Sequence, residues 1–376
     1  MEENKMSAVT VQKERSSLMS VPTRLGTKPE DYERFHIRQS EIQLWEDGRR
    51  TDGSPGDYEW WYFDAHLDDG AKVVVVFQTK ELAEINKPLT PTIRIDLTLP
   101  NGTQLDKLVE LDPAKFSASK ERCDVQVGEN TFSGDLHAYT IHAKVDEIEL
   151  DITLTGQLPA WRPATGYFLF GEKGEDIFAW LPSVPQGKVT ATYSVNGDTH
   201  TTSGVGYHDH NWGNVAMLKL MHHWYWARGK AGPYSVINSY ITAEKKYGYT
   251  ELPIFMLARD GKVIADDPDK VRFEELGRYT DEHTGKPVGN VTRYTYTDGD
   301  ERYVITYTRH RDLSTMKFLD EVKGPKKLAA RLLGFDGAYL RFTGELRIEH
   351  YRGDELLDGH ADEALWELMY FGHARP

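Results

Sequence analysis

The chain has 376 residues and a formal net charge of −14, from 59 acidic and 45 basic side chains. This acidic balance, without a basic cluster, argues against binding to nucleic acid or to an anionic membrane surface, because both need Lys and Arg. The longest aliphatic run, Val73–Phe77, is far shorter than a spanning helix, so no intrinsic membrane insertion is expected. The oligomeric state stays open.

The N-terminus and the cysteine content bear on the cellular compartment. Residues 1–30 are polar and aperiodic and are expected to form a mobile tail, without the apolar core of a signal peptide. The single cysteine, Cys123, cannot form an internal disulfide or a Cys-rich zinc site, and its charged neighbours suggest a solvated strand edge. A reducing, cytoplasmic location is the default expectation.

From about residue 36 the sequence consists of short alternating runs separated by Asn-Gly, Asp-Gly and Gly-Asp turns. These runs are Lys72–Gln78, Thr92–Leu99, Ile148–Leu154, Lys188–Val195, Tyr234–Thr242, Ile254–Ala258, Arg293–Tyr296, Tyr303–Thr308 and Phe342–Tyr351. Many short strands with hairpin turns predict an all-β sandwich or barrel. Helical periodicity is clear only at Pro325–Leu333, and Asp362–Phe371 is ambiguous.

A weak internal repeat suggests two related units. Residues 61–63 (Trp-Tyr-Phe) are followed by Gly70 and a strand, and residues 224–226 (Trp-Tyr-Trp) are followed by Gly232 and a strand. A duplication would give two β-domains, each opened by an aromatic strand. The alternative is that any two aromatic strands followed by a turn look alike.

The domain boundary is expected in Pro182–His200, which carries two prolines and an Asn-Gly turn. This divides the ordered chain into an N-terminal domain, residues 31–195, and a C-terminal domain, residues 196–376.

Three segments concentrate polar and aromatic side chains: Glu59–Asp64, Gly206–Gly213 and His222–Arg228. Side chains alternate between the two faces of a strand. This alternation groups Tyr207, Asp209 and Asn211 opposite His208, His210 and Trp212, and Glu59, Trp61 and Phe63 opposite Trp60, Tyr62 and Asp64. In the third segment it groups His222, Trp224, Trp226 and Arg228 opposite His223, Tyr225 and Ala227. A carboxylate walled by aromatic rings is desolvated, so its pKa rises toward neutrality, which suits a general acid. The alternative is a buried hydrogen-bond network that closes a barrel end.

Other chemistries find little support in the sequence. His208 and His210 could present two imidazoles to one ion, but no third ligand stands at a fixed spacing, so no metal is expected. There is no nucleophile elbow, phosphate-binding loop or dinucleotide fingerprint, and no cofactor is expected.

Two motifs, Glu59-Trp60-Trp61-Tyr62 and residues 206–213 (Gly-Tyr-His-Asp-His-Asn-Trp-Gly), resemble the paired signatures of the carotenoid 1,2-hydratase-like superfamily. That group includes AttH-like bacterial proteins, kievitone hydratase and lipocalin-like Diels–Alderases. The resemblance covers most of the chain from about residue 36. It implies two lipocalin-like antiparallel β-barrel or sandwich domains, packed side by side with few helices, and a ligand site near their junction. It also points to Glu59, Trp61, Tyr207, His208, Asp209, His210 and Trp212 as site residues.

Three functions follow as alternatives. The first is a cofactor-free hydratase that adds water to an isolated alkene of an apolar, terpenoid-like or prenylated substrate. In this reading Asp209 is the acid, His208 or His210 orients it or activates water, and Glu59 is a further catalytic candidate. The predicted substrate-binding residues are Tyr207, Asn211, Trp212, Trp61, Tyr62, Asp64, Trp224, Trp226, Arg228 and Tyr240. The second function is a Diels–Alder-type cyclase of a polyene natural product, and the third is a non-catalytic carrier of an apolar ligand.

Overall fold

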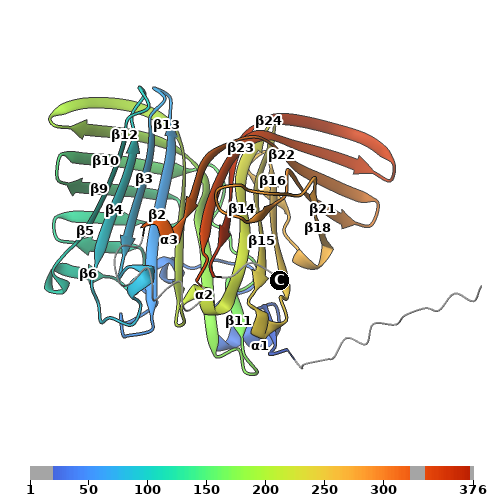
Figure 1. Cartoon of the computed structure of the whole chain (residues 1–376), viewed down its shortest axis with the longest axis horizontal. Coiled ribbons are helices and arrows are strands. Elements are labelled where there is room, and N and C mark those ends of the chain that lie inside the picture. Colours follow the sequence, from blue (N-terminus) through green and yellow to red (C-terminus); the bar gives the residue numbers. More distant parts are fainter. Residues whose placement is uncertain (1–19, 322–334, 373–376) are drawn as a thin grey trace, which may run out of the picture.

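The computed structural model describes residues 20–321 and 335–372, and most of them lie in antiparallel strands. The strands form two large curled sheets that lie side by side, the first in blue and green and the second in yellow to red (Figure 1). The predicted all-β fold with few helices is therefore confirmed. The helix expected at Pro325–Leu333 lies outside the described residues, and the ambiguous segment Asp362–Phe371 mostly belongs to a strand.

The first sheet has thirteen strands within the described residues, in the order β5-β4-β3-β2-β13-β12-β10-β9-β8-β7-β6, with β11 and β1 attached to β12 at the side. Their bounds are β1 Thr23–Leu25, β2 Tyr58–Leu67, β3 Lys72–Gln78, β4 Thr92–Thr98, β5 Gln104–Glu110, β6 Phe116–Ala118, β7 Asp124–Val127, β8 Asn130–Gly134, β9 Ala138–Val145, β10 Ile148–Gly156, β11 Tyr167–Phe170, β12 Asp176–Val195 and β13 Asp198–Gly213.

The first sheet curls around a core of its own. Strands from opposite parts of the sheet send side chains into one cluster, among them Trp61 and Phe63 of β2, Phe132 of β8 and Tyr193 of β12. Because successive side chains of a strand point to opposite faces, the other face of β2 and β13 is left to contact the second sheet.

The change from the first sheet to the second comes later than the expected boundary at residues 195 and 196. Asn196 and Gly197 both have positive φ, as a two-residue hairpin turn requires, and they join β12 to β13 within the first sheet. Pro182 and Pro185 lie inside β12 where its register with β13 shifts, because a bulge tolerates a residue that cannot donate to the ladder. The chain enters the second sheet only after Gly213.

The second sheet has nine strands within the described residues, in the order β17-β16-β15-β14-β24-β23-β22-β21-β18. Their bounds are β14 Met221–Ala231, β15 Tyr234–Ala243, β16 Glu251–Arg259, β17 Lys262–Ala265, β18 Val271–Leu276, β21 Val291–Asp298, β22 Glu301–Lys317, β23 Ala338–Arg352 and β24 Glu355–Tyr370, while β19 Tyr279–Thr280 and β20 Pro287–Val288 pair separately.

The helices are short. They are α1 Pro29–Arg34, α2 Met217–Leu220 and α3 Phe318–Glu321, with 3-10 helices η1 Leu44–Asp47, η2 Leu82–Glu84, η3 Pro113–Lys115, η4 Lys245–Tyr247 and η5 Pro268–Lys270. Part of the expected N-terminal tail is structured, because β1 pairs with β11 and α1 follows it.

Nothing among the described helices is both long enough and apolar enough to cross a membrane.

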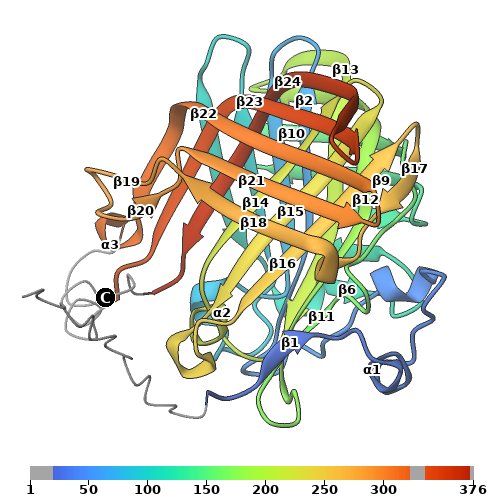
Figure 2. The ribbon, with the colours of Figure 1, turned by 90° about the vertical axis from the view of Figure 1, so that its right-hand side faces the viewer.

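The two sheets meet through a shared apolar cluster. It joins Trp180 and Tyr207 of the first sheet to Ile237 and Met256 of the second. Figure 2 shows the second sheet in front, with its strands crossing those of the first. The two copies of the sequence repeat form corresponding hairpins, β2–β3 in the first sheet and β14–β15 in the second.

Candidate functional site

Strand β13 carries two different groups of polar side chains on its two faces. Its neighbour β2 runs antiparallel, with Tyr207 opposite Asp64, Asp209 opposite Tyr62 and Asn211 opposite Trp60. These six side chains are on the face that meets the second sheet. The predicted alternation is therefore confirmed for these two segments. In the third segment the register of β14 shifts between Met221 and His223, and the Nδ1 atoms of His222 and His223 lie 2.7 Å apart, so these two rings do not lie on opposite faces as predicted.

Asp209 lies at the centre of the face between the sheets and accepts three hydrogen bonds. The Tyr207 hydroxyl donates to its Oδ2 at 2.7 Å, and Trp180 Nε1 donates to the same oxygen at 2.8 Å. Asn211 Nδ2 donates to its Oδ1 at 2.7 Å. The Asp209 residue is only 7% exposed. All three direct partners are neutral donors.

Burial raises the pKa of Asp209 from 3.8 to about 6, although the hydrogen bonds from Tyr207 and Trp180 favour the carboxylate and oppose the shift. Asp209 therefore exists in both protonation states near neutral pH. The same donors stabilise the carboxylate that remains after a proton is given away. These are the properties of a general acid.

Asp64 and Arg228 form an ion pair that links the two sheets, from β2 to β14. The Tyr62 hydroxyl donates a second bond to Asp64 Oδ2 at 3.2 Å. The guanidinium carbon of Arg228 lies 5.2 Å from the centroid of the Tyr207 ring, so this ion pair is continuous with the surroundings of Asp209. The side chain of Arg228 remains 18% exposed, which keeps the pair accessible.

Aromatic rings from both sheets surround these polar groups. The Tyr207 ring lies 5.6 Å from that of Trp226 and 6.3 Å from that of Tyr62, between centroids. Trp224 and Trp226, although they face the first sheet, are only partly buried against the shared cluster. We call the set Tyr62, Asp64, Trp180, Tyr207, Asp209, Asn211, Trp224, Trp226, Arg228, Arg341 and Glu367 the intersheet site. Its partly buried rings offer apolar contact surface beside the polar groups.

Sequence reasoning missed two charged members of this site, Glu367 and Arg341. The pairing of β14, β24 and β23 places Trp226, Glu367 and Arg341 in one row across the second sheet. Glu367 accepts hydrogen bonds from Trp224 Nε1 at 3.3 Å and from the Tyr339 hydroxyl at 2.7 Å. Burial raises the pKa of Glu367, against the effects of the Tyr339 hydrogen bond and of the Arg341 charge. The available signal was a lone glutamate in the apolar run 364–371.

The opposite face of β13 carries a second group, which we call the enclosed cluster: Asp47, Glu59, Tyr139, His208 and His210. His210 Nε2 lies 2.8 Å from Glu59 Oε1, and its Nδ1 lies 3.5 Å from Asp47 Oδ1. His208 Nε2 lies 3.4 Å from Asp47 Oδ2, which also accepts a 2.5 Å hydrogen bond from the Tyr139 hydroxyl. All five residues are buried inside the curl of the first sheet.

The Asp47 carboxylate of the enclosed cluster is held in its charged form. Burial alone would raise the pKa of Asp47, but the charge and hydrogen bond of His208 and the charge of His210 lower it below its usual value. Glu59 accepts hydrogen bonds from the backbone N–H groups of Arg50 at 2.6 Å and Thr51 at 2.8 Å. This cluster ties the segment after η1 to β2 and β13.

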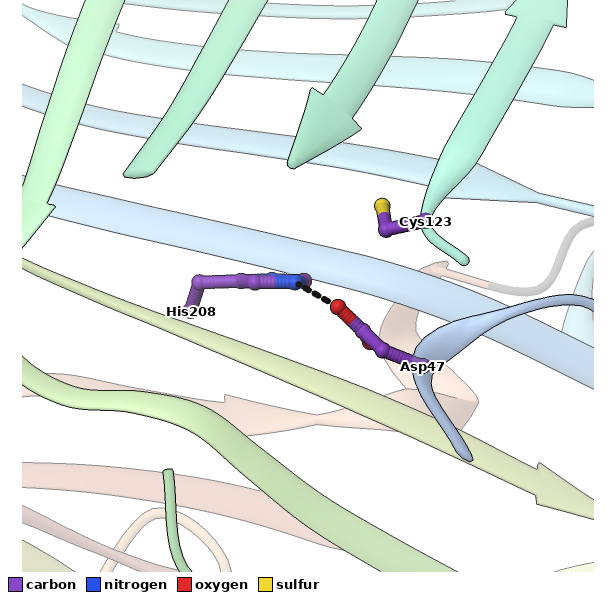
Figure 3. Close-up of side chains that lie close together, drawn as sticks. All are labelled: Asp47, Cys123 and His208. Atoms are coloured by element: carbon purple, nitrogen blue, oxygen red, sulfur yellow. Dashed lines mark hydrogen bonds and ion pairs between the residues drawn. The ribbon is translucent and has the colours of Figure 1, made fainter. Parts of the chain in front are cut away.

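Asp47, Cys123 and His208 could hold a metal ion, since their ligand atoms all lie within 4.8 Å of one another. Figure 3 shows the His208 ring pointing at Asp47, with Cys123 beside them. Two of these potential ligands come from segments far from the His208 motif in the sequence, so no fixed spacing could reveal them. Cys123 is 1% exposed, which corrects its assignment to a solvated strand edge. Burial raises the pKa of its thiol well above the usual value.

Several predicted site residues lie away from Asp209. His208 and His210 contact the enclosed cluster, so the prediction that either orients Asp209 is wrong. Glu59 belongs to the same cluster. The remaining displaced residues are Trp61, whose ring stacks on His210 at 4.7 Å, Trp212, which packs on Tyr167 at 5.5 Å, and Tyr240, which stacks on Phe273 at 4.0 Å. These residues lie away from Asp209 because successive side chains of a strand point to opposite faces of the sheet.

Comparison with solved structures identifies the architecture. CghA in complex with Sch210972 superposes with a TM-score of 0.60 over 90% of this chain and 98% of that chain, at 15% sequence identity. Kievitone hydratase from Nectria haematococca superposes with a TM-score of 0.51 over 93% of this chain and 97% of that chain, at 13% identity. The two-sheet fold is therefore shared with these two proteins.

The family follows from the sequence match. This chain belongs to the Diels-Alderase-like family, which it matches over residues 53–274. It is also 24% identical over 277 residues to the quinolone epoxide rearrangement protein penF of Penicillium thymicola, a match that spans 67% of this chain and 75% of that protein. The matched residues include β2, β13 and β14, which supply most of the intersheet site.

Proposed function

We propose that this chain is an enzyme that rearranges an apolar, oxygen-bearing natural product in the intersheet site, with Asp209 as general acid and without a cofactor. The observation that carries the proposal is a buried carboxyl group whose pKa is raised to about 6 among rings of both sheets. The relative penF, named for quinolone epoxide rearrangement, supports an epoxide of this kind as the substrate.

The proposed reaction is an isomerisation. The carboxylic acid of Asp209 gives its proton to the epoxide oxygen, and one C–O bond breaks with its electron pair going to that oxygen. A neighbouring substituent then migrates with its bonding pair to the carbon that has become cationic. Finally the hydroxyl proton returns to the Asp209 carboxylate as a carbonyl forms, so the enzyme ends as it began.

The surrounding side chains can stabilise both the negative charge on Asp209 and the positive charge on the substrate during this reaction. The Tyr207, Trp180 and Asn211 donors stabilise the Asp209 carboxylate while the substrate is cationic. The rings of Trp224 and Trp226 offer cation–π stabilisation of about 2 kcal/mol each when desolvated. Hydration, the first function expected from the sequence, also begins with a proton from Asp209, but that proton goes to an alkene carbon, and water then takes the cationic carbon.

The test is to incubate a quinolone epoxide with the purified chain and to determine the product by mass spectrometry. Rearrangement gives an isomer of unchanged mass, whereas opening of the epoxide by water adds the mass of one water. Conversion should require the chain and should fall to near background with folded Asp209→Asn. If the wild-type chain leaves the epoxide at its spontaneous rate, the proposed reaction is wrong.

A Diels–Alder-type cyclisation is the second candidate, and family membership is the observation that favours it. Such a reaction needs a folded substrate and hydrogen-bond donors to a carbonyl, which Tyr207 and Arg228 can supply, but no proton transfer. Replacement of Asp209 by Asn should then cost less than about tenfold in kcat. A polyene substrate assayed with the same two proteins separates the two candidates.

A further inference from the structure

Arg341 of β23 is a charged side chain of the intersheet site, and the described part of the chain offers it no partner. Within residues 20–321 and 335–372, its guanidinium has no hydrogen bond and no ion pair. It is nevertheless only partly exposed, and Tyr62 and Asp64 of the first sheet act on it electrostatically. None of its nitrogens is among the buried unpaired polar atoms of the described residues, so its N–H groups reach solvent and are free to donate to a ligand.

The two nearby carboxylates do not fill this role, because each already has its own partners. Asp64 pairs with Arg228 and accepts the Tyr62 hydroxyl. Glu367, the neighbour of Arg341 across the strands, accepts bonds from Trp224 and Tyr339 instead. Burial lowers the pKa of Arg341, but the acidic groups around it, Tyr339 first, raise it by more, so the group stays a cation.

We propose that Arg341 binds an anionic oxygen group of the substrate, a carboxylate or an enolate, at the second-sheet wall of the intersheet site. A guanidinium presents a planar fork of N–H donors that matches two oxygens of such a group. The substrate is then an apolar body, held by the rings around Trp224 and Trp226, with an acidic group at one end. The inference rests on the intersheet site as the place of binding, and not on the reaction proposed for Asp209.

The experiment compares two fluorescent probes with the same aromatic body. One is 8-anilinonaphthalene-1-sulfonate, which is an anion, and the other is N-phenyl-1-naphthylamine, which is uncharged. Arg341→Met keeps a long apolar side chain but removes the donors. We expect it to weaken binding of the anionic probe about tenfold or more, the scale of a hydrogen bond to a charged group. Binding of the uncharged probe should change less than about twofold.

The matched control is Arg347→Met, on the same strand and the same face but exposed. It should leave both affinities unchanged. Arg341→Lys, which keeps the charge without the planar fork, should give an intermediate loss for the anion. Because Arg341 has no hydrogen-bond or ion-pair partner among the described residues, its replacement should not lower the thermal midpoint.

Two results would overturn the proposal. One is an Arg341→Met variant that binds the anionic probe as tightly as the wild type, or that weakens both probes equally. The other is independent binding of the two probes, without mutual displacement, which would place the anion outside the intersheet site. Neither measurement involves turnover, so a failure of the Asp209 mechanism leaves this test intact.

Discussion

His208 and Asp209 are neighbours in the chain, yet they belong to regions with opposite physical character. In the enclosed cluster, carboxylates face imidazoles inside the curl of the first sheet, and the pKa of Asp47 is lowered. In the intersheet site, the direct partners of Asp209 are neutral donors, and burial raises its pKa to about 6. Neither burial nor residue type alone therefore decides the role of an ionisable group; the charge of its partners does.

This comparison assigns different roles to the two faces of β13. A carboxylate whose surroundings lower its pKa, as those of Asp47 do, keeps its charge at neutral pH and has no proton to release. It stabilises the arrangement of η1, β2 and β13 instead. A carboxyl group beside partly exposed rings can exchange its proton with a ligand. The predictions below test this division.

The largest expected effect is on stability, from Glu59→Gln in the enclosed cluster. The change removes the carboxylate that His210 and the backbone N–H groups of Arg50 and Thr51 contact, and breaking a buried pair of this kind costs about 3–5 kcal/mol of unfolding free energy. The measurement is urea unfolding at neutral pH. The matched control is Glu149→Gln, whose pair with Lys144 is on the surface with the glutamate side chain 41% exposed, and which should cost less than about 1 kcal/mol. Equal losses in the two variants would contradict the structural role of the enclosed cluster.

The next effect is on catalysis, from Asp209→Asn in the intersheet site. This change keeps the size of the side chain but removes the transferable proton. We expect kcat to fall about 100-fold or more, the scale of general acid catalysis. Asp198→Asn is the matched control, because Asp198 is on the same strand with its side chain 83% exposed. A folded Asp209→Asn variant with near-full activity would move the search for the acid to Asp64 and Glu367.

The pH dependence gives a third effect. The acid must be protonated before it reacts, so kcat/KM should fall about tenfold per pH unit above pH 6. The wild-type chain should show this decline in a kcat/KM profile measured across neutral pH. The residual activity of Asp209→Asn should not show it. A wild-type profile that is flat across this range would contradict the role of Asp209.

The same raised pKa has a consequence for stability. The folded state holds the Asp209 proton more tightly than the unfolded state, so the unfolding free energy should fall as pH rises from about 4 to about 6. The shift from 3.8 to about 6 corresponds to about 3 kcal/mol. Asp47, with a lowered pKa, acts in the opposite sense, so the difference between the wild type and Asp209→Asn isolates the effect. A difference that does not change with pH would contradict the raised pKa.

The sequence predicts what depends on local periodicity. The period of two along β2, β13 and β14 is enough to assign Tyr62, Asp209 and Trp226 to facing walls. It does not predict partners that come from distant segments. Asp47 reaches His208 from a 3-10 helix, and Arg341 reaches the site from the C-terminal hairpin. The boundary error has a related cause, because Pro182 and Pro185 can mark either a linker or the bulges of a central strand.

The smallest expected effect is on ligand binding, from changes to two tryptophan rings. The sequence predicted that Trp61 and Trp226 both bind the ligand, but the structure places them in different regions. Trp226 is partly exposed in the intersheet site, 5.6 Å from the Tyr207 ring between centroids. Trp61 is fully buried in the core of the first sheet, where its Nε1 donates to the backbone oxygen of Asp47 at 3.2 Å.

Trp226→Phe keeps a ring but removes part of the contact area. It should weaken binding of N-phenyl-1-naphthylamine about two- to fivefold, the scale of part of an aromatic contact. Trp61→Phe should leave that affinity unchanged and should instead lower the thermal midpoint, because it creates a void and removes a buried hydrogen bond. Fluorescence titration and thermal unfolding of both variants give the four values needed. The reverse pattern, with affinity lost in Trp61→Phe and kept in Trp226→Phe, would place the ligand inside the first sheet and exchange the roles assigned to the two faces of β13.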